Sequence, residues 1–325
     1  MRHSRPPTSN GAGPVIALDI GGTSIRGGIV TEGSRPQIRL RRREATQAQT
    51  GGAAVLKRVL TMAAALQAEA PEVTGVAVAS AGVIDPATGA VASATELMPG
   101  WAGIQIGAAL RAELNLESTV LNDVHAHALG EFHLGAGEGS SSTLVVAVGT
   151  GLGGAFISGG ELILGAGGLA GHVGHMHHAA AAGIACSCGR TGHLESVASG
   201  SGMTSRYAET RQHEEPAADD GAAVAALASE ATGTARKTLV AAGAALGECL
   251  GSLANAWDPE TIILSGSVTG AGEPWWEAVR SGYCSSAMDA LQDRPVVLGS
   301  LGDDAPLLGA AALHRESDVA EERQR

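Results

Sequence analysis

The sequence predicts an α/β protein made of two related halves. Short apolar segments typical of strands alternate with Ala- and Leu-rich segments that favour helix. In two places, 15–30 and 144–158, a strand runs into a glycine-rich turn and the chain returns as a second strand. The similarity of these two units predicts related halves that face one cleft.

Each expected element has a local reason. Strands are short apolar or alternating runs, and we expect them at 15–18, 25–30, 39–43, 73–79, 120–121, 144–148, 155–157 and 262–264. We expect helices at 52–70, 124–131, 222–256, 275–281 and 306–315, the first of which contains no Pro and is rich in good helix formers. Residues 1–13 are expected to form a loose tail, and 165–200 an irregular Gly-, His- and Cys-rich segment.

Composition excludes several classes of protein. The 325 residues carry 21 Lys and Arg against 33 Asp and Glu, a net charge of −12, which argues against nucleic acid or an anionic membrane as partner. The four arginines within 39–43 therefore indicate a solvated strand. Aromatic residues are only 2%, so the core must be built from Ala, Val, Leu and Ile.

We expect no targeting or membrane-spanning segment in this chain. No apolar run reaches the roughly 18 residues of a membrane helix, and the N-terminus has no apolar h-region. Four cysteines in a chain of this length do not make a disulfide scaffold. We therefore expect a cytoplasmic protein.

The first glycine turn is a candidate anion site. Asp19, Gly21, Gly22 and Thr23 follow the first strand. Paired glycines let backbone N–H groups approach a phosphate, Thr23 adds a hydroxyl, and Asp19 can hold Mg²⁺ through water. An ordinary hairpin turn explains the same residues equally well.

Two further turns follow strands in the second half. Gly149, Thr150, Gly151 and Gly153 can cradle further phosphates, but their spacing is not that of a dinucleotide-binding turn, and the segment returns as strand. Gly266 and Ser267 follow the strand at 262–264, where backbone can lie against a purine.

Asn122 and Asp123 lie between a strand end and a helix. An Asp in that place can accept a proton from a substrate hydroxyl. Taken alone, however, the pair is more typical of a helix N-cap.

A metal site is predicted in the irregular segment. His175, Cys186, Cys188 and His193 offer two imidazoles and two thiolates, a set suited to tetrahedral zinc of structural type. The spacing is not that of a zinc finger, so reduced cysteines among scattered histidines remain an alternative. Three other histidines could substitute as ligands: His172, His177 and His178.

In this order, the motifs resemble the ROK family of sugar kinases and sugar-responsive repressors over nearly the whole chain, about 15–314. The most specific stretches are the glycine-rich run at 165–171 with His172 and His175, and the run from Cys186 to Glu195. Within the family they are most similar to bacterial N-acetylmannosamine kinases, as is the segment 307–311.

The resemblance implies an actin/hexokinase-type (ribonuclease H-like) two-domain fold with ATP and sugar in the interdomain cleft. A smaller domain would comprise 14–120 and about 303–325, and a larger one 121–302 with a zinc loop at 172–195. By resemblance, Asp123 is the catalytic base for the sugar 6-hydroxyl, and the other sugar-contacting positions are Asn122, His172, His175 and Glu195. The three glycine turns correspond to the Mg-ATP site, and His175 doubles as a zinc ligand.

The resemblance implies an ATP-dependent kinase for a hexose or N-acylhexosamine, with N-acetyl-D-mannosamine as first choice. Many ROK glucokinases have Glu where His172 stands, and His193 replaces the family's third Cys. A smaller difference is Ser24, where many members have Lys.

Glucose or N-acetylglucosamine is the alternative substrate. A non-catalytic sensor or a repressor is weaker, since only 18 residues precede Asp19, too few for a helix-turn-helix domain. Family members suggest a homodimer or homotetramer, with no nucleic-acid or membrane partner.

Overall fold

The computed structural model describes residues 13–95, 97–230 and 233–322. The chain divides into two compact units, one of residues 1–138, 164–169 and 303–325 and the other of 139–163 and 170–302. Apart from Gly13, the expected tail at 1–13 lies outside the described residues.

The first unit contains a five-stranded mixed sheet in the order β3-β2-β1-β4-β7. Strands β1, β2 and β3 are antiparallel neighbours, whereas β4 and β7 continue the sheet parallel to β1. The elements of this unit are β1 (Val15–Ile20), β2 (Ser24–Val30), β3 (Ile38–Ala45), α1 (Gly52–Glu69), β4 (Gly75–Ser80), β5 (Val83–Ile84), β6 (Val91–Ser93), α2 (Ile106–Leu114), β7 (Glu117–Asn122), α3 (Asp123–Leu134) and α9 (Ala305–Glu322).

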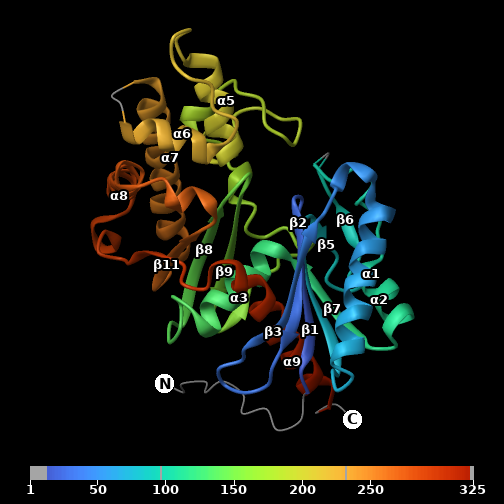
Figure 1. Cartoon of the computed structure of the whole chain (residues 1–325). Helices are drawn as coiled ribbons and strands as arrows, with labels where there is room; N and C mark the ends of the chain where they lie inside the picture. The colour runs from blue at the N-terminus through green and yellow to red at the C-terminus, as the bar shows by residue number, and fades with distance from the viewer. Residues whose placement is uncertain (1–12, 96, 231–232, 323–325) are drawn as a thin grey trace. The chain divides into compact units, whose positions relative to one another are not determined.

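Alternation along β1 assigns its two faces. Ile16, Leu18 and Ile20 pack into one apolar core with the buried faces of α1 and α2. The other face is covered by α3 and α9, so the sheet lies between two helical layers (Figure 1). Asp19 belongs to this second face. Its partner Arg26 also pairs with Asp303, in the turn just before α9.

Small residues bring α3 and α9 together. A Cβ on Gly130 would meet the backbone of Ala305, and a Cβ on Gly309 would meet the carbonyl of Ala126. Glycine is therefore required at this crossing because the two backbones are in contact. For the same reason α3 lies in the first unit, whereas the sequence-based division starts the second domain at residue 121.

The second unit repeats the arrangement. Its sheet has the order β10-β9-β8-β11-β12, with the same alternation of antiparallel and parallel neighbours as the first sheet. The predicted similarity of the two strand–turn–strand units is thus confirmed. The elements of this unit are β8 (Ser142–Val148), β9 (Leu152–Ser158), β10 (Glu161–Leu162), α4 (Glu195–Ala198), α5 (Gly200–Thr210), α6 (Gly221–Glu230), α7 (Thr234–Trp257), β11 (Thr261–Ser265), α8 (Glu273–Ser286) and β12 (Val296–Leu298).

The long helix α7 forms the centre of the second core. By length and apolar composition α7 is long enough to cross a membrane, but 61% of its most apolar stretch is buried inside the protein. It packs on α8, and its buried residues belong to the same apolar core as Leu144, Val146 and Val148 of β8. These contacts identify it as a core helix.

Candidate functional site

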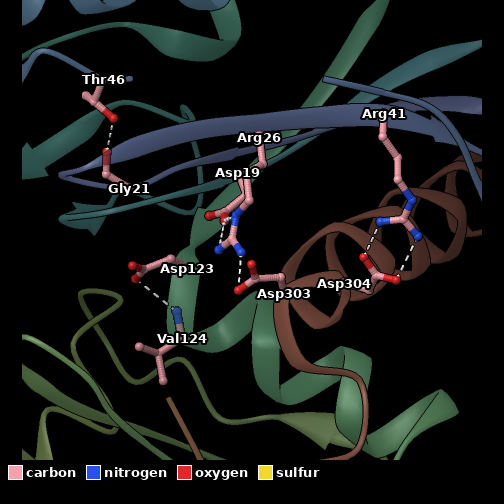
Figure 2. Close-up of polar contacts among 9 residues, drawn as sticks. All are labelled: Asp19, Gly21, Arg26, Arg41, Thr46, Asp123, Val124, Asp303 and Asp304. Atoms are coloured by element: carbon pink, nitrogen blue, oxygen red, sulfur yellow. Dashed lines mark hydrogen bonds and ion pairs between the residues drawn. The ribbon is translucent and has the colours of Figure 1, made fainter. Parts of the chain in front are cut away.

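Asp123 is the first residue of α3, directly after β7 (Figure 2). Asn122 is the N-cap, because its side-chain oxygen accepts the N–H groups of Val124 (2.9 Å) and His125 (3.2 Å). The Asn122 amide also donates to Gly82 O and to Asp123 Oδ1, both at 2.9 Å. The capping role therefore falls on Asn122 and leaves Asp123 for other chemistry.

The environment of Asp123 makes it a weak acid. Burial, together with the nearby charge of Asp19, raises the pKa of Asp123 to about 7, although hydrogen bonds from Val124 and Asn122 oppose the shift. A carboxyl group with a pKa near neutrality is suited to taking up a proton. The geometry is thus compatible with the general-base role that the sequence suggests.

Asp19 and the turn after it lie at the end of β1. Asp19 is 3% exposed and accepts two hydrogen bonds from Arg26. Thr46 holds the turn from the far side: its hydroxyl donates to Gly21 O at 2.6 Å and its N–H to Thr23 O at 3.0 Å. Gly22 and Thr23 remain exposed, as an anion-binding turn requires.

The second glycine turn is fastened to the N-terminus of α5. The Gly149 carbonyl accepts from Gly200 N at 2.8 Å, and the Thr150 carbonyl accepts from both the N–H and the hydroxyl of Ser201. Gly153 lies within β9, opposite Ala147 on β8. The turn therefore meets a helix N-terminus, where the positive end of the helix dipole favours anions.

A cavity of about 710 Å³ opens at this turn. Gly149, Thr150 and Ser267 line it, whereas Gly151 and Gly266 are the chain neighbours of lining residues. Gly266 has φ 91° and a Cβ there would lie 2.5 Å from Val148 O, so glycine is required where the chain leaves β11. The remaining lining residues come from α5, α6 and the segment before α8: Gly200, Ser201, Thr204, Ser205, Asp219, Asp220, Gly221, Ala222, Ala225, Ala226, Val268, Gly270, Ala271 and Gly272.

The predicted metal ligands gather in one place in the second unit. Among the described residues, the ligand atoms of His175, Cys186, Cys188 and His193 all lie within 4.8 Å of one another. Cys186 Sγ lies 3.6 Å from His175 Nδ1, and Cys188 Sγ lies 3.2 Å from His193 Nδ1. The alternatives His172, His177 and His178 are not part of this set.

These residues fit zinc. Zinc–ligand bonds of about 2.0–2.3 Å place tetrahedral ligand atoms roughly 3.3–3.8 Å apart, close to the two measured separations. A tight turn brings the two cysteines to the site: Gly189 has φ 83°, and Cys186 N donates to Arg190 O at 2.7 Å. Four protein ligands complete the coordination sphere, so such an ion would be structural.

Glu195 joins the metal cluster to the second glycine turn. Its Oε2 accepts from Leu152 N at 3.0 Å, and its Oε1 accepts from the Ser187 hydroxyl at 2.7 Å. His172 precedes the short 3-10 helix that carries His175, and their rings stack at 6.1 Å. Three of the predicted sugar-contacting residues, His172, His175 and Glu195, thus share one neighbourhood in the second unit, while Asn122 and Asp123 belong to the first.

Comparison with known proteins decides the family. The ROK family model matches residues 15–317. The chain belongs to the ROK family. The fold is correspondingly the ROK hexokinase and glucokinase fold, with two mixed α/β sheets in an actin-like two-domain structure.

ROK relatives of two substrate classes match over nearly their full length. An N-acetylmannosamine kinase from Yersinia pseudotuberculosis is 33% identical over 308 residues, 94% of this chain and 99% of the relative. A glucokinase from Halalkalibacterium halodurans is 28% identical over 330 residues, 95% of this chain and 97% of the relative. A Streptomyces griseus ROK glucokinase, solved with glucose and AMPPNP, superposes with a TM-score of 0.79 at 28% identity, covering 93% of this chain and 99% of that one.

Sequence reasoning missed parts of this ROK site. The cavity residues on α5 and α6 belong to no phosphate motif and were not expected. Ser199 and Asp220 are the available signals, since each accepts backbone N–H groups at the start of a helix: Gly202 N at 3.0 Å and Ala223 N at 2.8 Å. Arg26 was also missed, because nothing in the local sequence marks it as the partner of Asp19.

Proposed function

We propose that this ROK protein is an ATP-dependent sugar kinase that phosphorylates the 6-hydroxyl of a hexose or N-acylhexosamine, with N-acetyl-D-mannosamine as its preferred substrate. The observation that carries the proposal is Asp123, a carboxyl group at the end of β7 whose pKa is raised to about 7. It supplies a base for the sugar hydroxyl in a chain whose relatives include named sugar kinases.

In this proposal each unit contributes its own chemistry. Asp123 takes the proton of the 6-hydroxyl as the oxygen attacks the terminal phosphorus of ATP, and ADP leaves. The amides of the exposed turn at Gly22 and Thr23 and those near Gly149 and Thr150 hold phosphate oxygens. Mg²⁺, when bound, offsets the charge of the phosphates.

The cavity of about 710 Å³ is proposed as the nucleotide site. Its lining includes the polar residues Thr150 and Ser201 together with Ala225, Val268 and Ala271, whose apolar side chains suit a purine. The triphosphate would then point at the turn that is fastened to the α5 N-terminus.

The sugar assignment rests on the second unit. His172 agrees with the N-acetylmannosamine group of the ROK family, where many glucokinases have Glu. The metal cluster positions His175, and the Glu195 carboxylate is held at both oxygens, so these side chains would present a fixed surface to the sugar. A homodimer or homotetramer remains our expectation for the assembly.

Glucokinase activity is the second candidate. It is favoured by the 28% identity to a named glucokinase and by the fold shared with a glucose-bound enzyme. A non-catalytic sensor is disfavoured because both Asp19 and Asp123 are present with their surroundings intact.

ADP release with Mg-ATP over a panel of sugars tests the proposal. The panel contains N-acetylmannosamine, N-acetylglucosamine, glucose, mannose, fructose and allose, with the Asp123→Asn variant as the background for sugar-independent hydrolysis. We expect kcat/KM for N-acetylmannosamine to exceed the others by at least about tenfold, roughly 1.4 kcal/mol of transition-state binding. A preference for glucose would contradict only the choice of N-acetylmannosamine. The absence of ADP release with every sugar would contradict the assignment as a sugar kinase.

A further inference from the structure

Arg26 is a charged residue inside the first unit that the proposed reaction has not yet used. It stands on β2 directly opposite Asp19 on β1, so the two side chains share one face of the sheet. Arg26 Nε and Nη2 both donate to Asp19 Oδ2, at 2.9 and 2.6 Å. The guanidinium therefore grips one carboxylate oxygen from two directions and leaves Oδ1 for another partner (Figure 2).

The third nitrogen of the guanidinium is anchored from a distant part of the chain. Arg26 Nη1 pairs with Asp303, in the 3-10 turn (Gly302–Asp304) that leads into α9. The Asp303 side chain is 74% exposed, whereas those of Arg26 and Asp19 are 23% and 5% exposed. The exposed carboxylate of Asp303 thus orients the partly buried guanidinium of Arg26.

The orientation of Arg26 matters because negative charges gather around Asp19. Asp123 lies near enough to Asp19 for the Asp19 charge to disfavour its ionised form. A phosphoryl donor would add further negative charge beside these two carboxylates. Arg26 lies against Asp19, while the charge of Arg43, its register partner on β3, helps to lower the pKa of Asp303.

We propose that Arg26 is a positioning residue of the kinase, which acts through Asp19 by fixing its carboxylate, and that Asp303 holds Arg26 in place. This inference rests on the proposed function. Arg26 touches neither sugar nor nucleotide in the proposal, so its removal should slow the reaction without weakening sugar binding.

The test compares four variants under saturating substrates. Arg26→Met removes the charge, Arg26→Lys keeps it, and Asp303→Asn releases the anchor at an exposed position. The matched control is Arg41→Met, because Arg41 on β3 also pairs with an aspartate of the turn before α9, the neighbouring Asp304, through Nη1 to Oδ1 and a 2.8 Å bond from Nη2 to Oδ2. Calorimetric sugar binding without nucleotide and thermal melting accompany the kinetics.

We expect Arg26→Met to lower kcat by about tenfold or more while the sugar dissociation constant stays within about twofold. Arg26→Lys should recover most of the loss, Asp303→Asn should lose less than Arg26→Met, and Arg41→Met should match the wild type. If Arg26→Met does not fold, the lysine and Asp303 variants decide the question.

Other outcomes separate the possible failures. An active wild type with unchanged kcat in Arg26→Met overturns the inference and leaves the kinase assignment standing. Weakened sugar binding with a lowered melting temperature, and no rescue by lysine, assigns Arg26 a purely structural role. A wild type without sugar kinase activity overturns the proposed function, and this inference with it.

Discussion

At the scale of single residues, Asp123 shows how a fold changes the chemistry of an ordinary side chain. In water its carboxyl group would be ionised well below neutral pH. Burial beside Asp19 raises its pKa to about 7, and the neighbouring Asn122 takes over the capping of α3. The sequence indicated both residues as candidates. The directions of their side chains decide that Asn122 caps α3 while Asp123 is left for the proposed role of base.

Asp123→Asn should lower kcat by about 10²–10⁴-fold, the usual contribution of a general base, while sugar binding stays intact. In the wild type, kcat should fall as the pH drops below about 7, because the protonated carboxyl cannot accept a proton. A pH–rate profile and calorimetric sugar binding are the measurements. Near-normal turnover in the Asn variant would exclude Asp123 as the base.

The same pKa shift predicts a stability effect. Since the folded pKa lies above the unfolded value, the folded protein retains this proton between about pH 4 and 7 while the unfolded chain loses it. The contribution of Asp123 to stability is therefore present at low pH and lost as the pH rises through 7. As the pH rises from about 4 to 7, the melting temperature of Asp123→Asn should increase relative to that of the wild type.

At the scale of elements, the loop 172–195 gains its order from side-chain ligands. Its secondary structure consists of short 3-10 turns and isolated bridges, including His177 with His193 and Ala185 with Thr191. Its backbone hydrogen bonds join parts of the loop to one another, such as Gly192 N to Ile184 O at 2.9 Å. The cluster of His175, Cys186, Cys188 and His193 adds side-chain links across the same loop.

Removal of zinc by a chelator should therefore lower the melting temperature and raise the sugar KM. His193→Ala should lose bound zinc, measured by elemental analysis of the purified protein. The matched control is His177→Ala, whose ring lies 5.2 Å from that of His193 but outside the ligand set. Equal zinc content in the two variants would refute the four-ligand assignment.

At the scale of the whole molecule, the chain builds two separate apolar cores on the same sheet topology. One core joins β1 to α1 and α2, and the other joins β8 to α7 and α8. The C-terminal helix α9 returns to the first unit, where Gly309 touches α3. The first unit thus depends on both ends of the chain.

The two separate cores predict that a destabilising substitution in one unit mainly affects the stability of that unit. Gly309→Val should press α9 away from α3, and Gly247→Val should press α7 away from the backbone of Val279 on α8, each at a cost of about 1–3 kcal/mol or more. Hydrogen exchange should accelerate mainly in the first unit for Gly309→Val and in the second for Gly247→Val. Equal acceleration everywhere in both variants would show a single cooperative unit.

The sequence by itself determined the α/β class and the repeated strand–turn–strand units, and it marked the four residues of the candidate metal cluster. These depend on local signals: apolar runs, glycine turns, and sulfur and imidazole donors at close spacing. Short helices and strands without a strong pattern, such as α5, β12 and the β5–β6 pair, were not predicted. Their formation depends on partners that are distant in sequence.

Only the tertiary structure decided which side chains face each other. The pairing of Arg26 with Asp19 follows from the β1–β2 register, and its link to Asp303 spans most of the chain. The cavity beside Thr150 needs α5 and α6 to close round the turn. A local pattern specifies the chemistry that a residue can perform, whereas long-range packing sets the neighbours, burial and charge that determine whether it does so.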